Sequence, residues 1–277
     1  MTALELPAFP SSLPADHAAF LRALITRLAA DPRIVGILAG GSYLTNAMDQ
    51  HSDLDLVIAV DAHDYAAVML ERERLAAALG QLLVAFTGEH VGEPRLLICL
   101  YEAPLLHVDL KFVEVADLAE RVEEPAVLWQ RDHRLQIALA AGVAEYPAPS
   151  PAWLERRFWV WVHYTASKIE RGELFEALHS LDYLRSVVLG PLGLLAVGAR
   201  PSGVRRVETA APELARRLEA TVSKYDAADC LRGLKACVEV YRWLRGSSAA
   251  SASAIEVTVM RHVARIGFPN PGKPLGT

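Results

Sequence analysis

Residues 40–58 read GGSYLTNAMDQHSDLDLVI, and two carboxylates in this stretch decide how the chain is interpreted. Asp53 and Asp55 stand one residue apart where residues 54–60, an apolar run, predict a buried β-strand. Side chains at positions i and i+2 of a strand point to the same face. Both carboxylates therefore share one face, while the apolar side chains that alternate with them pack on the other.

Paired carboxylates on a buried strand need something that offsets their charge. Two neighbouring acids repel each other and are costly to remove from water, so they require a cation or an open cleft. Mg²⁺ prefers oxygen ligands and commonly binds one or two carboxylates together with substrate phosphates. Asp53 and Asp55 therefore predict a divalent metal site. The pair alone also fits a structural role, in which Asp53 caps a turn and Asp55 lies on an exposed edge.

A glycine-rich turn precedes the two carboxylates. Gly40, Gly41 and Ser42 follow residues 34–39, which predict another strand, and open residues 42–48, where we expect a short helix. Glycines let a backbone come close to a phosphate, and a helix N-terminus with a serine hydroxyl supplies donors for an anion. The turn therefore predicts a phosphate site close to the metal site.

A third acid stands alone in another apolar run. Asp109 lies in residues 106–113, which predict a strand, and it joins the pair if the two strands are neighbours. His107 and Lys111 share its face at positions i−2 and i+2, where they either line the site or are ordinary surface residues. Three lone acids in two apolar strands are hard to explain structurally, which favours a functional site.

The composition indicates a globular chain with no obvious nucleic-acid or membrane partner. Of the 277 residues 52% are hydrophobic, the formal net charge is −5, and the arginines are scattered. The N-terminal residues do not resemble a signal peptide, and no apolar run reaches the roughly 18 residues of a membrane span. Three cysteines, Cys99, Cys230 and Cys237, lack the spacing of zinc ligands. We therefore expect a soluble, cytoplasmic protein with reduced thiols.

The first half of the chain alternates helical and strand patterns. This order predicts an α+β domain, built on one mixed sheet with helices around it. The expected helices cover residues 16–30 and 63–79, and the expected strands cover residues 34–39, 54–60, 82–86, 96–101 and 106–113.

The stretch YPAPSPAW, residues 146–153, contains three prolines and marks a domain boundary. We expect one domain over residues 1–146 and a second, all-helical bundle over residues 153–270. A flexible linker is expected over residues 246–254 and a loose tail after Gly267. The helical patterns of the second domain cover residues 153–171, 174–189, 212–223, 227–244 and 254–266.

The motifs of the first domain resemble those of the nucleotidyltransferase superfamily, which includes DNA polymerase β and the aminoglycoside nucleotidyltransferases. The shared pattern is a strand, a Gly-Ser turn, an Asp-x-Asp in the next strand and a third Asp in a later strand. It covers residues 34–113, and no part of it is missing. The matching residues are Gly41, Ser42, Asp53, Asp55 and Asp109.

Residues 156–185 resemble the first helical hairpin of antibiotic adenylyltransferases, and residues 127–135 resemble the strand and turn that precede it there. In that family a lysine of the hairpin reaches the triphosphate of the nucleotide. The resemblance assigns this role to Lys168. The alternative is an ordinary lysine on the solvent face of a helix.

The resemblance implies transfer of a nucleoside monophosphate, most often AMP from ATP, to a hydroxyl group, with release of pyrophosphate. Two Mg²⁺ ions would be held by Asp53, Asp55 and Asp109. Gly41 and Ser42 would bind the β- and γ-phosphates together with Lys168, and the nucleotide would lie in a cleft between the domains.

The acceptor stays open. A small hydroxyl-bearing molecule such as an aminoglycoside is our leading hypothesis, with antibiotic resistance as the associated function, because acids of the helical hairpin suit a cationic acceptor. The alternatives are a protein or tRNA acceptor, as in toxin–antitoxin systems, and a non-catalytic nucleotide-binding protein. Monomer and homodimer are both compatible with the sequence. The candidate general bases are Glu89, Glu102, Glu170, Glu173, Glu176 and Asp182.

Overall fold

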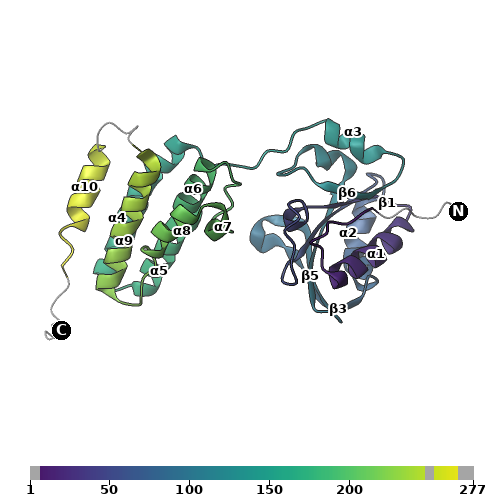
Figure 1. Ribbon diagram of the computed structural model, residues 1–277, viewed down its shortest axis with the longest axis horizontal. Coiled ribbons are helices and arrows are strands. Elements are labelled where there is room, and N and C mark those ends of the chain that lie inside the picture. Colours follow the sequence, from purple (N-terminus) through teal and green to yellow (C-terminus); the bar gives the residue numbers. More distant parts are fainter. Residues whose placement is uncertain (1–6, 247–252, 268–277) are drawn as a thin grey trace. The chain divides into compact units, whose positions relative to one another are not determined.

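The computed structural model describes residues 7–246 and 253–267. The chain divides into two compact units, residues 1–146 and 147–277, each with its own hydrophobic core (Figure 1). The first unit contains a sheet flanked by helices, and the described part of the second is helical. This architecture confirms the predicted fold class. Most of the expected linker and the expected tail lie outside the described residues.

The sheet of the first unit has six strands in the order β3-β4-β5-β2-β1-β6. Only β2 and β5 pair in parallel among the described strands, so the sheet is mixed. The strand bounds are β1 Ile34–Ala39, β2 Leu54–Val60, β3 Gln81–Gly88, β4 Glu93–Glu102, β5 Leu106–Glu114 and β6 Ala126–Gln130.

Helices cover the two faces of this sheet unequally. Helices α1 (Ala15–Ala29) and α2 (Tyr65–Ala77) pack on the face to which Leu54 and Leu56 of β2 point, and they build the larger core there. Among the described residues, the opposite face carries the short helix α3 (Arg134–Ala140), which Figure 1 shows on the other side of β1 from α1, and the 3₁₀ turn Val115–Ala119, whose Leu118 joins Leu135 of α3 in a smaller core. Because α3 packs only part of that face, the end of the sheet that bears the aspartates is left without a helix of this unit.

The predicted bounds match β1 and β2, and the strands predicted over residues 82–86, 96–101 and 106–113 lie within β3, β4 and β5, but three local expectations were wrong. The short helix expected over residues 42–48 is only a 3₁₀ turn, Gly41–Tyr43, because Asn46 has a positive φ of 50° that a helix does not tolerate. Helix α1 begins with Ala15, directly after Pro14 and one residue before the expected start. Residues 127–135 also hold the start of α3, which the apolar pattern did not reveal.

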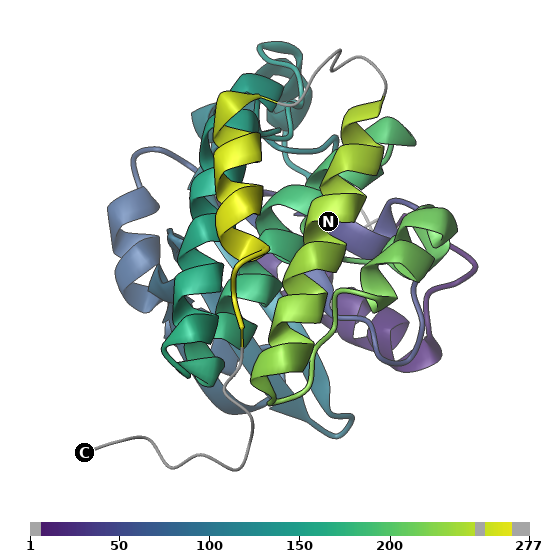
Figure 2. The same ribbon diagram turned by 90° about the vertical axis from the view of Figure 1, so that its left-hand side faces the viewer.

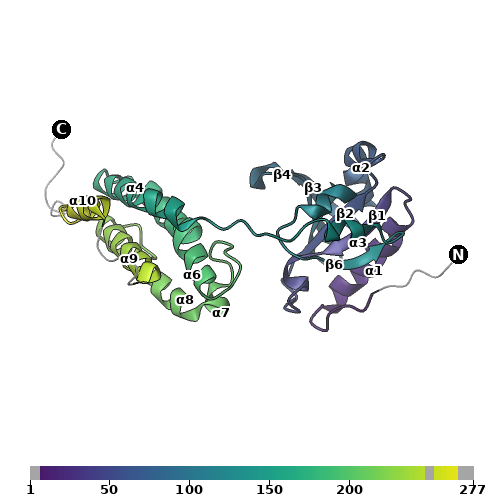
Figure 3. The same ribbon diagram turned by 90° about the horizontal axis from the view of Figure 1, so that it is seen from above.

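The second unit is a bundle of helices around one core. Phe158 stacks on Tyr241 with ring centroids 3.7 Å apart, and Trp159, which is fully buried, meets the same tyrosine edge-on. Figures 2 and 3 show α10 beside α4 and the bundle from above. The bounds are α4 Pro151–Glu170, α5 Leu174–Tyr183, a π-helical turn Leu184–Leu189, α6 Gly190–Ala196, α7 Val207–Ala210, α8 Pro212–Glu219, α9 Ala227–Arg245 and α10 Ala254–Val263.

The tryptophans of α4 do not all pack in the core. Trp153 is 39% exposed, and its ring lies 5.7 Å from that of Trp161.

Within the described residues, no helix is both long and apolar enough to cross a membrane.

Candidate active site

The parallel pairing of β2 with β5 brings two of the predicted acids together. Asp55 and Asp109 are direct partners in the register, and Asp53 immediately precedes the first paired residue, Leu54. Adjacent strands lie about 4.8 Å apart, and partners in register point to the same face. Asp55 and Asp109 are therefore neighbours on the face opposite α1 and α2, with Asp53 at the same end of the sheet.

Asp109 carries its negative charge at an energetic cost. Burial raises the pKa of this carboxyl group above its ordinary value of 3.8, and the charge of Asp53 raises it further. His107 partly offsets the shift, since its Nε2 lies 3.0 Å from Asp109 Oδ1. Because the carboxylate is half-buried beside another negative charge, a bound cation would favour its ionised form.

The glycine turn lies in close contact with Asp55. The amide of Gly40 donates a hydrogen bond to the backbone oxygen of Asp55 at 2.9 Å. Gly41 has a φ of +59°, and a Cβ at this position would lie 2.0 Å from Asp55 Oδ2. Only glycine satisfies both the left-handed backbone and this close approach.

The turn also contacts a residue that the sequence did not single out. The amide of Gly41 donates to Glu123 Oε1 at 3.0 Å, so a carboxylate oxygen occupies a donor that we had assigned to phosphate. Glu123 lies 82 residues after Gly41 in an acidic stretch, and no local sequence pattern links it to the turn. Ser42 Oγ is buried without a hydrogen-bond partner among the described residues, which leaves a hydroxyl available for a ligand.

The donor set suits a magnesium ion, although the described side chains do not converge on one point. Among residues 7–246 and 253–267, no three His, Cys, Asp or Glu side chains are arranged as a metal site. Asp53, Asp55 and Asp109 nevertheless bring carboxylate oxygens, the ligands that Mg²⁺ prefers, to one end of the sheet. Lys111, on the same strand face, pairs with Glu93 at 2.7 Å.

Lys168 lies on α4 in the second unit. Its Nζ is 2.5 Å from Glu173 Oε2 and 5.1 Å from the centre of the Tyr164 ring. The hydrogen bond that Lys168 donates to Glu173 raises the pKa of Lys168, which keeps the amine charged. Its role at a nucleotide stays a prediction.

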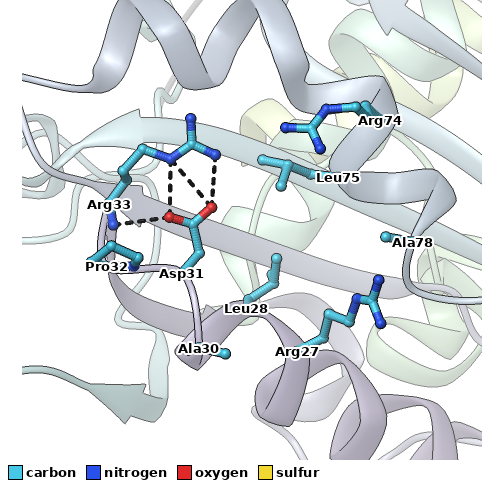
Figure 4. A pocket seen from close by; sticks show the side chains of 9 residues that line it. All are labelled: Arg27, Leu28, Ala30, Asp31, Pro32, Arg33, Arg74, Leu75 and Ala78. Carbon is cyan, nitrogen blue, oxygen red and sulfur yellow. Dashed lines mark hydrogen bonds and ion pairs between the residues drawn. The ribbon is translucent and has the colours of Figure 1, made fainter.

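A cavity of about 410 Å³ lies between the C-terminal ends of α1 and α2, and none of Asp53, Asp55 and Asp109 lines it (Figure 4). Its arginines have structural roles. Arg33 is held by both oxygens of Asp31 and by Glu71, while Arg27 and Arg74 lie in last helical turns, where cations are favourable. The lining residues are Arg27, Leu28, Ala30, Asp31, Pro32, Arg33, Arg74, Leu75 and Ala78.

Comparison with known proteins identifies the first unit. Residues 21–99 match the family model of the nucleotidyltransferase domain, a stretch that contains Gly41, Ser42, Asp53 and Asp55. This match supports the resemblance to the nucleotidyltransferase superfamily that the sequence motifs indicated. A search of curated protein sequences gave no match.

Two solved structures align with most of the chain. The first is an aminoglycoside 6-adenyltransferase from Bacillus subtilis, with 13% identity, a TM-score of 0.36, and coverage of 88% of this chain and 95% of that one. The second is a nucleotidyltransferase-like protein from Exiguobacterium sibiricum, with 14% identity, a TM-score of 0.35, and coverage of 83% and 74%. At such scores neither bears on the substrate of this chain.

The raised pKa of Asp109 leads to a prediction about stability. Because the folded state disfavours its ionised form, stability is greatest below the ordinary pKa and is lost as the pH rises through the folded pKa. Asp109→Asn should therefore raise the Tm at pH 7 relative to wild type. The gain should disappear below about pH 4, where Asp109 is protonated in both states. Thermal unfolding across this pH range measures it, and an equal or lower Tm at pH 7 would contradict the assigned burial.

Proposed function

We propose that this protein is a metal-dependent nucleotidyltransferase that transfers AMP from ATP to a hydroxyl group of a small molecule and releases pyrophosphate. The observation that carries the proposal is the register of β2 and β5. It sets Asp55 beside Asp109, with Asp53 one residue before the strand, next to a glycine turn. This arrangement lies largely within the segment that matches the nucleotidyltransferase domain.

The three aspartates are the proposed ligands of two Mg²⁺ ions. When bound, such ions neutralise phosphate charge and lower the pKa of the attacking hydroxyl. Asp53 and Asp55 would hold these ions together with Asp109, which would serve the acceptor side. Asp109 suits this position because His107 compensates its ionised form only in part.

The turn and Lys168 are the proposed phosphate ligands. The hydroxyl of Ser42, buried and without a hydrogen-bond partner in the described structure, donates to a phosphate oxygen. Binding of phosphate at the amide of Gly41 requires Glu123 to release its hydrogen bond. Lys168 exchanges its contact with Glu173 for a phosphate oxygen, which a charged amine on a flexible stem can do.

The proposed acceptor is a cationic compound with several hydroxyl groups, as aminoglycosides are. The helical hairpin of the second unit offers acids together with aromatic rings. Tyr164 donates to Glu176 at 2.8 Å, and the ring of Tyr183 lies 5.0 Å from that of Trp161. Acids favour a cationic acceptor, and partly exposed rings provide an apolar surface for a sugar face.

The direct test of activity is pyrophosphate release, screened over four nucleoside triphosphates and a panel of aminoglycosides and other hydroxyl compounds. Asp53→Asn and Asp55→Asn should each lower the rate more than roughly 100-fold, beyond what loss of a residue that only supports a metal ligand costs. Asp16→Asn, an exposed position on α1, is the control and should leave the rate unchanged.

Three outcomes would reject the proposal. Activity that survives Asp53→Asn excludes the metal mechanism. Radiolabel from α-labelled ATP on protein or RNA instead establishes a macromolecular acceptor, and nucleotide binding without pyrophosphate release over the whole panel establishes a binding protein.

The glycine turn can be tested with a matched pair of variants. Gly41→Ala and Gly92→Ala both place a side chain at positive φ, which costs about 1–2 kcal/mol. A Cβ at Gly92 meets nothing within 4 Å, whereas one at Gly41 displaces the carboxylate of Asp55. Both variants should lose stability, Gly41→Ala more because of this close contact, but only Gly41→Ala should weaken binding of Mg²⁺·ATP, by roughly tenfold or more. Calorimetric titration measures this, and equal affinities in both variants would remove the turn from the site.

Lys168→Met tests the phosphate contact in the second unit. Loss of one hydrogen bond between charged groups should raise KM for ATP roughly 10- to 100-fold, with a smaller change for the acceptor. Lys235→Met, an exposed lysine on α9, serves as the control. Steady-state kinetics with each substrate varied in turn decides the point, and an unchanged KM for ATP would leave Lys168 a surface residue.

A further inference from the structure

The loop that carries Asp53 is fastened to helix α1 by a buried histidine. His17 is 2% exposed, and its Nε2 lies 2.8 Å from the backbone oxygen of Ser52, the residue before Asp53. A carbonyl oxygen only accepts hydrogen bonds, so Nε2 carries the hydrogen. The other ring nitrogen, Nδ1, is buried without a hydrogen-bond partner among the described residues.

This histidine is a costly choice for packing alone. An unsatisfied nitrogen in a core is unfavourable, and an apolar side chain would avoid it. The neighbours of His17 on the same face of α1, Leu21 and Leu24, are fully buried apolar residues that fill the core without this penalty. The benefit of the ring therefore lies in the contact of Nε2 with Ser52.

The contact between His17 and Ser52 holds a turn that is also stabilised by hydrogen bonds of its own. Asp49 Oδ1 accepts hydrogen bonds from the amide of His51 at 2.8 Å and from Ser52 Oγ at 3.2 Å, and the amide of Asp49 donates to Ser52 Oγ at 3.0 Å. A second tie stands earlier in the loop, where the amide of Met48 donates to Ser12 Oγ at 3.3 Å. Residues 12–17 thus fix the loop at both ends.

Asp53 depends on this loop more than the other two acids do. Asp55 and Asp109 lie inside the ladder of β2 and β5, where neighbours on both sides fix their backbone. Asp53 stands one residue outside the ladder, which begins with Leu54. The orientation of the Asp53 side chain is therefore determined by β2 on its C-terminal side. On its N-terminal side it is determined by the carbonyl of Ser52, which His17 binds.

We propose that His17 is a positioning residue that orients the carboxylate of Asp53 toward the metal site, acting through the backbone of Ser52. The inference rests on the proposed function, since it needs Asp53 to be a metal ligand. His17 belongs to α1, which packs on the face of the sheet opposite the aspartates. The inference therefore adds a residue from that face to the proposed metal site.

The test removes the donor and then restores it in the full-length chain. His17→Leu and His17→Phe lack the N–H and differ in volume, so one can replace the other if either fails to fold. Each should lower kcat roughly 10- to 100-fold and raise the Mg²⁺ concentration for half-maximal rate, while KM for the acceptor stays within about threefold. His17→Gln, whose amide nitrogen can donate to the same carbonyl, should recover most of both losses.

Leu21→Ala is the matched control, because it destabilises the same helix and leaves the donor in place. At a temperature where all variants are folded it should keep the kcat and Mg²⁺ dependence of wild type. If His17→Leu or His17→Phe behaves as Leu21→Ala does, with a lower Tm and unchanged kinetics, His17 is only a core residue and the inference is wrong.

Metal binding gives a second readout that needs no acceptor. Titration of Mn²⁺ into the protein with a non-hydrolysable ATP analogue should show weaker binding to His17→Leu than to wild type and Leu21→Ala, with His17→Gln in between. Equal Mn²⁺ affinities overturn the inference. If wild type binds Mn²⁺ but releases no pyrophosphate with any acceptor, the proposed function fails while the positioning of Asp53 is still decided by these affinities.

Discussion

The pairing of β2 with β5 is the constraint on which the site depends. It is the parallel pair of an otherwise antiparallel sheet, so the chain must cross over between the two strands, which it does through α2, β3 and β4. The register of this pair sets Asp55 opposite Asp109. A slip by one residue would turn Asp109 into the core and its apolar neighbours to the open face.

The same pairing gathers negative charge at one end of the sheet. Asp55 lies against Gly41, Glu123 accepts from the amide of that glycine, and Asp109 stands half-buried beside Asp53. A phosphate that approaches the turn therefore meets several carboxylates. Like charges this close repel strongly where water is partly excluded, so a nucleotide needs cations between its phosphates and these acids. This is the physical reason for linking phosphate binding to metal binding.

Much of the fold was predictable because local patterns determine it. Residues 34–39 and 54–60 have the lengths and apolar content of strands and form β1 and β2 with those bounds, and the helical periods predicted α4 and α9 well. Helix α3 was missed because its few residues pack through a long-range contact, in which Leu135 fills the space above Gly36. The 3₁₀ turn was missed because Asn46 adopts a positive φ that the sequence did not indicate.

The acids of the site could be found from the sequence, but the residues that hold them could not. Asp53, Asp55 and Asp109 stand out because each is a charge in an apolar run, which is a local signal. Glu123 and His17 have no such signal, since one lies 82 residues from Gly41 and the other 35 residues from Ser52.

Ser42 Oγ and His17 Nδ1 are both buried without a hydrogen-bond partner among the described residues, and both lie in segments that border the aspartates. Stability alone would favour an apolar side chain at each place. Their presence in the same part of the fold as Asp109, whose ionised form burial also disfavours, fits the proposed role of this end of the sheet in binding a ligand, while the rest of the sheet supplies stability.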